Sequence, residues 1–168
     1  TTALELEVGV LPVGEFYDNC AKEGRPINYG TSAAWSSARI MTFNPELGSD
    51  GKPLPNIGFF KAGKPVPSVA FFLDGFSHPN WVNNVATPEQ LENILAMTEQ
   101  GLKEGGIGIG CPWGYAPGAP LSELRELWAL AKKYDRPTYT HIQNLSMVEP
   151  DSGTKNMIEL MGLAAATG

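Results

Sequence analysis

Hydrophobic and polar residues alternate along this chain with two different periods. Residues 2–8 change polarity at every second position, which places Leu4 and Leu6 on one face of a strand and Glu5 and Glu7 on the other. In the residues after this strand, apolar positions recur every three or four residues, as in a helix. The two patterns then alternate along the chain. The strands predicted in this way are 2–8, 27–31, 68–74, 106–111 and 137–142. The predicted helices are 13–23, 88–104, 121–134 and 154–167.

Two of these helices carry especially clear signals. Thr87-Pro88-Glu89-Gln90 fits a capping box with proline at the first helical position, so the helix 88–104 has a well-marked start. Its apolar face contains Leu91, Ile94, Leu95, Thr98 and Leu102. The helix 121–134 is expected to bury Leu124, Leu127, Trp128 and Ala131.

Helices that alternate with short apolar strands are typical of βα units repeated around a parallel sheet. The sequence therefore predicts an α/β fold whose sheet is either open or closed into a barrel. In a barrel, the five predicted strands would be parallel and each would pair with the next one along the chain. Residues 44–67 interrupt the pattern because proline and glycine recur there, so we expect an irregular insertion or long loop with at most a short hairpin near 57–61. The length of 168 residues suits a single domain.

Charge and hydropathy exclude several classes of protein. The chain has 12 Lys and Arg residues against 18 Asp and Glu, a net charge of −6, and no run of cations, so no nucleic-acid partner is expected. No apolar run approaches the ~20 residues that cross a bilayer, and residues 1–5 lack the features of a signal peptide. We therefore expect no membrane partner and a cytoplasmic location, where Cys20 and Cys111 would be reduced thiols.

In a parallel βα array, functional side chains gather where the strands end. His141 closes the strand 137–142 and is followed by polar residues, the pattern of an imidazole that projects into the mouth of the sheet and binds a metal. Glu5 and Glu7 lie near the end of the first strand. Cys111 closes the strand 106–111 and is expected to pack in the core, with a nucleophile or metal ligand as the alternative. His78 lies in a loop and is expected to be structural.

Three segments of the second half follow one another in a distinctive order. They are Gly-Gly-Ile-Gly-Ile-Gly at 105–110, Trp-Gly-Tyr-Ala-Pro-Gly-Ala at 113–119 and Tyr-Thr-His-Ile-Gln-Asn at 139–144. Together with Thr1-Thr2 and Asn28-Tyr29-Gly30, these segments resemble the central part of the amidohydrolase superfamily, in its N-acyl-D-amino-acid deacylase (D-aminoacylase) branch. The resemblance spans essentially all of residues 1–168.

The resemblance implies part of a (β/α)8 TIM-type barrel, about strands 2–5 with their helices, as a partial metal-dependent hydrolase domain over 1–168. In that family zinc-activated water attacks the amide carbonyl of a small N-acyl amino acid, here most closely an N-acyl-D-amino acid. His141 would be a metal ligand, and Glu7 or Glu5 would bridge as a carboxylate where relatives have cysteine. Tyr115 and Gln143 would contact the substrate.

One or two zinc ions are implied as cofactor, in a site that residues 1–168 complete only in part. The other ligands and the catalytic aspartate of the family would lie outside 1–168, so no catalytic residue is expected here and this segment alone is expected to be inactive. At least three protein ligands are usual for catalytic zinc.

Two other functions stay open. A hydantoinase-like or dihydroorotase-like enzyme for cyclic amides would be favoured by a lysine at the end of a strand, and no predicted strand ends on lysine. A non-catalytic α/β module would instead bind a small ligand or a partner through exposed sheet edges. A homo-oligomer is compatible with each of these functions.

Overall fold

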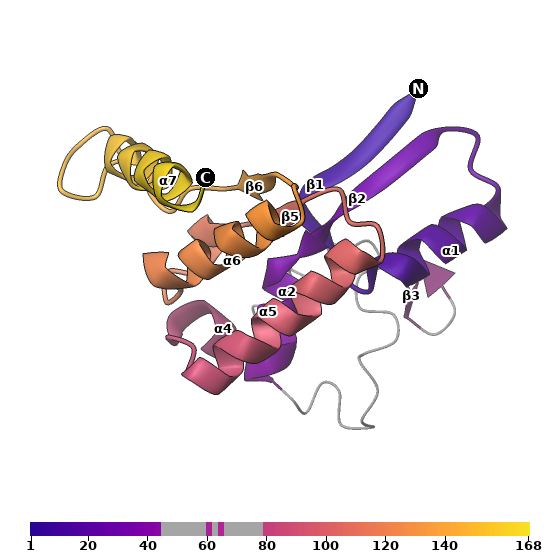
Figure 1. Cartoon of the computed structure of the whole chain (residues 1–168), viewed down its shortest axis with the longest axis horizontal. Helices are drawn as coiled ribbons and strands as arrows, with labels where there is room; N and C mark the ends of the chain where they lie inside the picture. The colour runs from indigo at the N-terminus through magenta and orange to yellow at the C-terminus, as the bar shows by residue number, and fades with distance from the viewer. Residues whose placement is uncertain (45–59, 62–63, 66–78) are drawn as a thin grey trace.

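The computed structural model describes residues 1–44, 60–61, 64–65 and 79–168. Four strands form one parallel sheet in the order β1 (Thr2–Val10), β2 (Asn28–Ala34), β5 (Ile109–Cys111) and β6 (Thr138–Thr140) (Figure 1). All three neighbouring pairs run parallel, including β5 with β6. The α/β class and the parallel sheet are therefore confirmed, and the sheet curls in a way that is compatible with part of a barrel.

The helices connect and cover these strands. They are α1 (Val13–Glu23), α2 (Trp35–Phe43), α4 (Asn80–Asn83), α5 (Pro88–Lys103), α6 (Leu121–Lys133) and α7 (Gly153–Thr167), with a 3₁₀ turn η3 (Trp113–Tyr115) after β5. The short strands β3 (Phe60–Lys61) and β4 (Lys64–Pro65) pair antiparallel, close to the hairpin predicted near 57–61. No helix in the described part of the chain is long and apolar enough to cross a membrane.

Local signals placed the helix ends accurately. The Thr87 hydroxyl accepts the Gln90 N–H at 3.2 Å and the Gln90 side chain accepts the Thr87 N–H at 2.9 Å, so the predicted capping box begins α5. Helix α1 ends at Glu23 because Gly24 adopts a left-handed conformation, with φ of 65°. The helix thus stops just before Arg25-Pro26, and proline disfavours a helical conformation at the residue before it.

Two expectations need correction, and one helix was not predicted. Helix α2 was not predicted, and it follows β2 without any loop. Strand β2 pairs directly with β5, so the predicted order with 68–74 between them is wrong; residues 68–74 themselves, and His78, lie outside the described residues. Trp128 is half-buried, whereas Leu124 and Leu127 on the same helix are fully buried.

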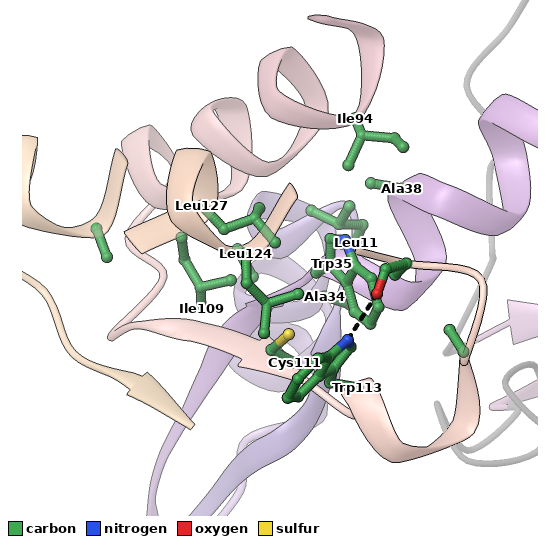
Figure 2. Close-up of a cluster of buried hydrophobic side chains, with 14 of the residues drawn as sticks. Leu11, Ala34, Trp35, Ala38, Ile94, Ile109, Cys111, Trp113, Leu124 and Leu127 are labelled. Atoms are coloured by element: carbon green, nitrogen blue, oxygen red, sulfur yellow. Dashed lines mark hydrogen bonds between the residues drawn. The ribbon is translucent and has the colours of Figure 1, made fainter. Parts of the chain in front are cut away.

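The main core lies between the sheet and the helices that follow its strands. Figure 2 shows Leu124 and Leu127 of α6 meeting Ile109 and Cys111 of β5, with Trp113 beyond them. The Trp113 indole N–H donates to the Ala119 carbonyl at 2.8 Å, drawn as the dashed line in Figure 2. This bond fixes the loop that leaves β5, and the loop in turn lies beside the candidate site.

Candidate functional site

The carboxyl end of β1 leaves the regular ladder in a bulge. Glu5 pairs with Thr31 and Val10 pairs with Ala33, so residues 6–9 of β1 lie opposite Ser32 alone. The Ser32 hydroxyl donates to the Leu6 carbonyl at 2.5 Å. This extra length carries β1 out of its position beside β2.

The bulge reaches across β2 to touch β5. A Cβ added to Gly110 would lie 2.7 Å from the carbonyl oxygens of both Leu6 and Glu7, so glycine is required for this approach. In a flat sheet, β1 and β6 would be separated by three strand spacings, about 14 Å. The bulge and the curl of the sheet shorten this distance, and the end of β1 comes close to the end of β6.

Glu7 and His141 are in direct contact at this end of the sheet. The Oε1 atom of Glu7 lies 2.8 Å from Nδ1 of His141, and the two side chains are 51% and 31% exposed. An ionised carboxylate can only accept a hydrogen bond, so this contact places the donated hydrogen on Nδ1. In the neutral imidazole Nε2 then carries the lone pair, so Nε2 is the nitrogen that can bind a metal ion or accept a hydrogen bond.

The backbone of His141 is held from both sides. Its N–H donates to the Cys111 carbonyl at 3.0 Å, and its carbonyl accepts the Gly114 N–H at 2.9 Å. A Cβ on Gly114 would lie 2.7 Å from Cδ2 of the His141 ring. The imidazole is therefore positioned by the end of β5 and by η3 as well as by Glu7.

Tyr115 stands beside the pair. Its ring centroid lies 5.0 Å from that of His141, at an interplanar angle of 48°, and the side chain is 42% exposed. The neighbouring loop packs closely because the Gly118 N–H donates to the Val82 carbonyl at 2.8 Å. The structure thus brings three of the predicted site residues together: Glu7, His141 and Tyr115.

Gln143 lies two residues beyond His141 and is half-buried. The next residue, Asn144, donates its backbone N–H to the Asn156 side-chain oxygen of α7 at 2.6 Å, which ties this loop to the helix. Gln143 therefore lies in a loop that is fixed to α7 one residue further on, at Asn144.

Glu5 has a different role from Glu7. Its Oε1 accepts the backbone N–H groups of Val8 at 3.2 Å and of Gly9 at 3.4 Å, so it caps the bulge from within the same strand. The alternation that placed both glutamates on one face ends at this bulge. Of the two carboxylates, Glu7 is the one that meets His141.

Cys111 is buried in the core, 1% exposed. Burial raises the pKa of its thiol well above the ordinary value, and the Glu123 carboxylate raises this pKa further while Arg39 opposes the shift. The neutral thiol is a packing group, in keeping with the core role expected for it.

An ion pair that the sequence did not suggest lies behind the site. Arg39 Nη1 of α2 contacts Glu123 Oε2 of α6 at 2.5 Å, with side chains 0% and 2% exposed. The Trp35 indole N–H donates to the other Glu123 oxygen at 2.8 Å, and Arg39 Nε donates to the Trp81 carbonyl at 2.6 Å. Arg39 also donates to the Asn84 carbonyl. A lone arginine among the apolar residues of 35–43 was the available signal, since a buried cation needs a carboxylate.

The donor types of the pair suit a zinc ion, whereas their number and spacing do not complete a site. Two ligands of one tetrahedral zinc, each at 2.0–2.2 Å, would lie about 3.3–3.6 Å apart. The 2.8 Å contact is the distance of a hydrogen bond. Within the described residues no group of three or more His, Cys, Asp or Glu side chains could hold a metal ion. Comparison of the chain with protein-family models, with curated proteins and with solved structures gives no match.

Proposed function

We propose that this chain forms part of the active site of a metal-dependent amide hydrolase of the amidohydrolase type, which removes the acyl group from N-acyl-D-amino acids. The observation that carries the proposal is the contact between Glu7 and His141 at the carboxyl ends of β1 and β6, 2.8 Å apart. In parallel α/β sheets this edge is where ligands and catalytic groups lie. The remaining strands of a (β/α)8 barrel would supply the missing ligands.

The two residues would have different roles at the metal site. His141 offers Nε2 as the donor to zinc, and Glu7 holds the ring through Nδ1, an arrangement that fixes tautomer and orientation in metal sites. In this geometry Glu7 would act on the ion through the imidazole, because Nε2 points away from the side of the ring that Glu7 contacts. A zinc ion bound there would lower the pKa of water to about 7 and polarise an amide carbonyl. Tyr115, beside the imidazole, would orient the substrate through its hydroxyl, and Gln143 would do so through its amide.

Zinc content tests the proposal first. The complete protein encoded by the reading frame is expressed with added zinc, dialysed and analysed for metal. We expect bound zinc in the wild type and a loss of at least half of it in His141→Ala and Glu7→Gln. Glu15→Gln is the matched control, because Glu15 is an exposed carboxylate on α1. Stoichiometric zinc unaffected by His141→Ala, or no zinc at all, would contradict the metal assignment and favour the non-catalytic binding module.

Activity tests the substrate class separately. Release of the free amino acid is followed for N-acetyl-D-amino acids, with the L-enantiomers and a cyclic amide as comparison. We expect the D-substrates to be hydrolysed, and we expect Tyr115→Phe to raise KM or lower kcat. Faster hydrolysis of the cyclic amide would assign the hydantoinase-like alternative instead, and kinetics unchanged in Tyr115→Phe would remove Tyr115 from the site.

A further inference from the structure

A second concave site lies at the other end of β6. An open cavity of about 370 Å³ is lined by the last turns of α6, by the residues that lead into β6 and by the end of α7. The three elements lie together at one end of the molecule (Figure 1). Thr138, the first residue of β6, lines the cavity, whereas His141 follows the last residue of that strand. The cavity is therefore separate from the Glu7–His141 pair.

The volume suits a small organic molecule, since ligand pockets begin at about 300 Å³. One part of the wall is apolar and is formed by Trp128, Ala131, Pro137 and Ala164. Trp128 is half-buried, in contrast to the fully buried Trp35 and Trp81. A partly exposed indole at the wall of a cavity is a surface on which a flat apolar group can pack.

The polar part of the wall carries two cations and one anion. Lys132 and Arg136 are exposed, line the cavity and form no ion pair within the described residues. Arg136 donates from Nη1 to the Asp135 carbonyl at 3.1 Å, which leaves the rest of its guanidinium for a ligand. Asp135 is the only acidic side chain among the residues that line the cavity, so the lining side chains carry a net positive charge within a chain of net charge −6.

We infer that this cavity is a binding site for a small carboxylate with an aromatic or flat apolar body. The apolar body packs against Trp128, and the carboxylate is held by Lys132 and Arg136, because charge-assisted hydrogen bonds from ammonium and guanidinium groups suit a carboxylate. The Thr138 hydroxyl lies in the same wall and is a further hydrogen-bonding group. This inference stands independently of the proposed hydrolase function.

The test is a titration of the protein with phenylacetate, read by tryptophan fluorescence and by calorimetry. Phenylacetamide is the matched neutral ligand, of nearly the same shape. We expect saturable binding of phenylacetate and binding of phenylacetamide that is weaker by about tenfold, the loss of one charge-assisted interaction. Equal affinity for the two ligands, or no saturable binding of phenylacetate, would overturn the inference.

Variants locate the site. Lys132→Gln should weaken phenylacetate binding about tenfold, while Lys133→Gln, which changes the net charge equally but lies outside the cavity wall, should leave it unchanged. Asp135→Asn should tighten binding, because it removes the nearby negative charge and asparagine tolerates the positive φ of 52° at this position. Equal effects of the two lysine variants would show that the response is non-specific.

A steric pair of variants tests the cavity without changing charge. Ala164→Leu fills the wall and should abolish binding, whereas Ala165→Leu is an exposed substitution on the same helix outside the wall and should not. Trp128→Phe should remove the fluorescence change while calorimetry still detects binding. Glu7→Gln should leave phenylacetate binding unchanged. Binding that survives Ala164→Leu would place the ligand elsewhere.

Discussion

Two contacts between a carboxylate and a nitrogen-bearing side chain connect distant parts of this chain, and they differ in almost every physical respect. Arg39 and Glu123 are 0% and 2% exposed, and their polar atoms are occupied by the Trp35 indole and by two backbone carbonyls. Glu7 and His141 are 51% and 31% exposed and share a single contact of 2.8 Å. The first pair lies inside the core, and the second lies at the carboxyl ends of β1 and β6.

The difference separates a pair that is fully used inside the core from a pair that is partly open to solvent. Burial lowers the pKa of Arg39 while Glu123 opposes that shift, so each charge depends on the other to remain in the core. With most of their hydrogen-bonding capacity in use, these groups have little left to offer a ligand. In the exposed pair, the contact uses one nitrogen of His141 and one oxygen of Glu7, and both side chains are partly exposed, which leaves Nε2 and the second carboxylate oxygen for binding or catalysis.

Breaking the buried pair should have the largest effect. Arg39→Met leaves the Glu123 carboxylate buried without its cation and should lower the free energy of unfolding by about 3–5 kcal/mol, measured by urea denaturation. Arg125→Met is the matched control on α6, because Arg125 is 63% exposed and pairs with the exposed Glu126; it should change stability by less than about 0.5 kcal/mol. The double variant Arg39→Met/Glu123→Leu should recover part of the loss. Equal losses in the two arginine variants would remove the distinction between buried and exposed pairs.

Breaking the exposed pair should cost little stability. Glu7→Gln keeps the size of the side chain and removes a charge that water already screens, so the free energy of unfolding should fall by about 0.5 kcal/mol or less. The measurement is the same urea denaturation, with the exposed Glu15→Gln as the control. A fall of more than about 2 kcal/mol would make Glu7 a structural residue like Glu123.

A third group of contacts, around Glu99 on the surface, should have the smallest effect on stability, and this effect should depend on pH. Hydrogen bonds from Lys133, Tyr134 and Lys103 lower the pKa of Glu99 from 4.5 to about 2. An acid with a lowered pKa stabilises the folded state above its ordinary pKa, and this contribution is lost as the pH falls toward the lowered value. The difference in Tm between the wild type and Glu99→Gln should therefore narrow between pH 4.5 and about 2. A difference that stays constant over this range would show that Glu99 has no such role.

The sequence by itself determined those features that depend on near neighbours. The capping box at Thr87 and Gln90, the helix 13–23 and the succession of strands and helices all follow from residues a few positions apart. His141 could be singled out because it ends a strand, and a strand end in a parallel sheet is a defined place. Helix 35–43 escaped prediction because Ser36, Ser37, Arg39 and Thr42 break up its apolar positions. The partner of Arg39 lies 84 positions away.

The tertiary structure decided which of these side chains meet. Alternation places Glu5 and Glu7 on the same face of β1, and only the bulge opposite Ser32 turns Glu5 back onto its own strand. Glu7 reaches His141, 134 positions away, because Gly110 lets the bulge cross β2. The period of the polarity pattern specifies which face of the strand a residue occupies. The distance between Glu7 and His141 depends instead on the curl of the sheet and on the packing of Gly110 against the backbone of β1. Both involve strands that are distant in sequence, so no local pattern predicts them.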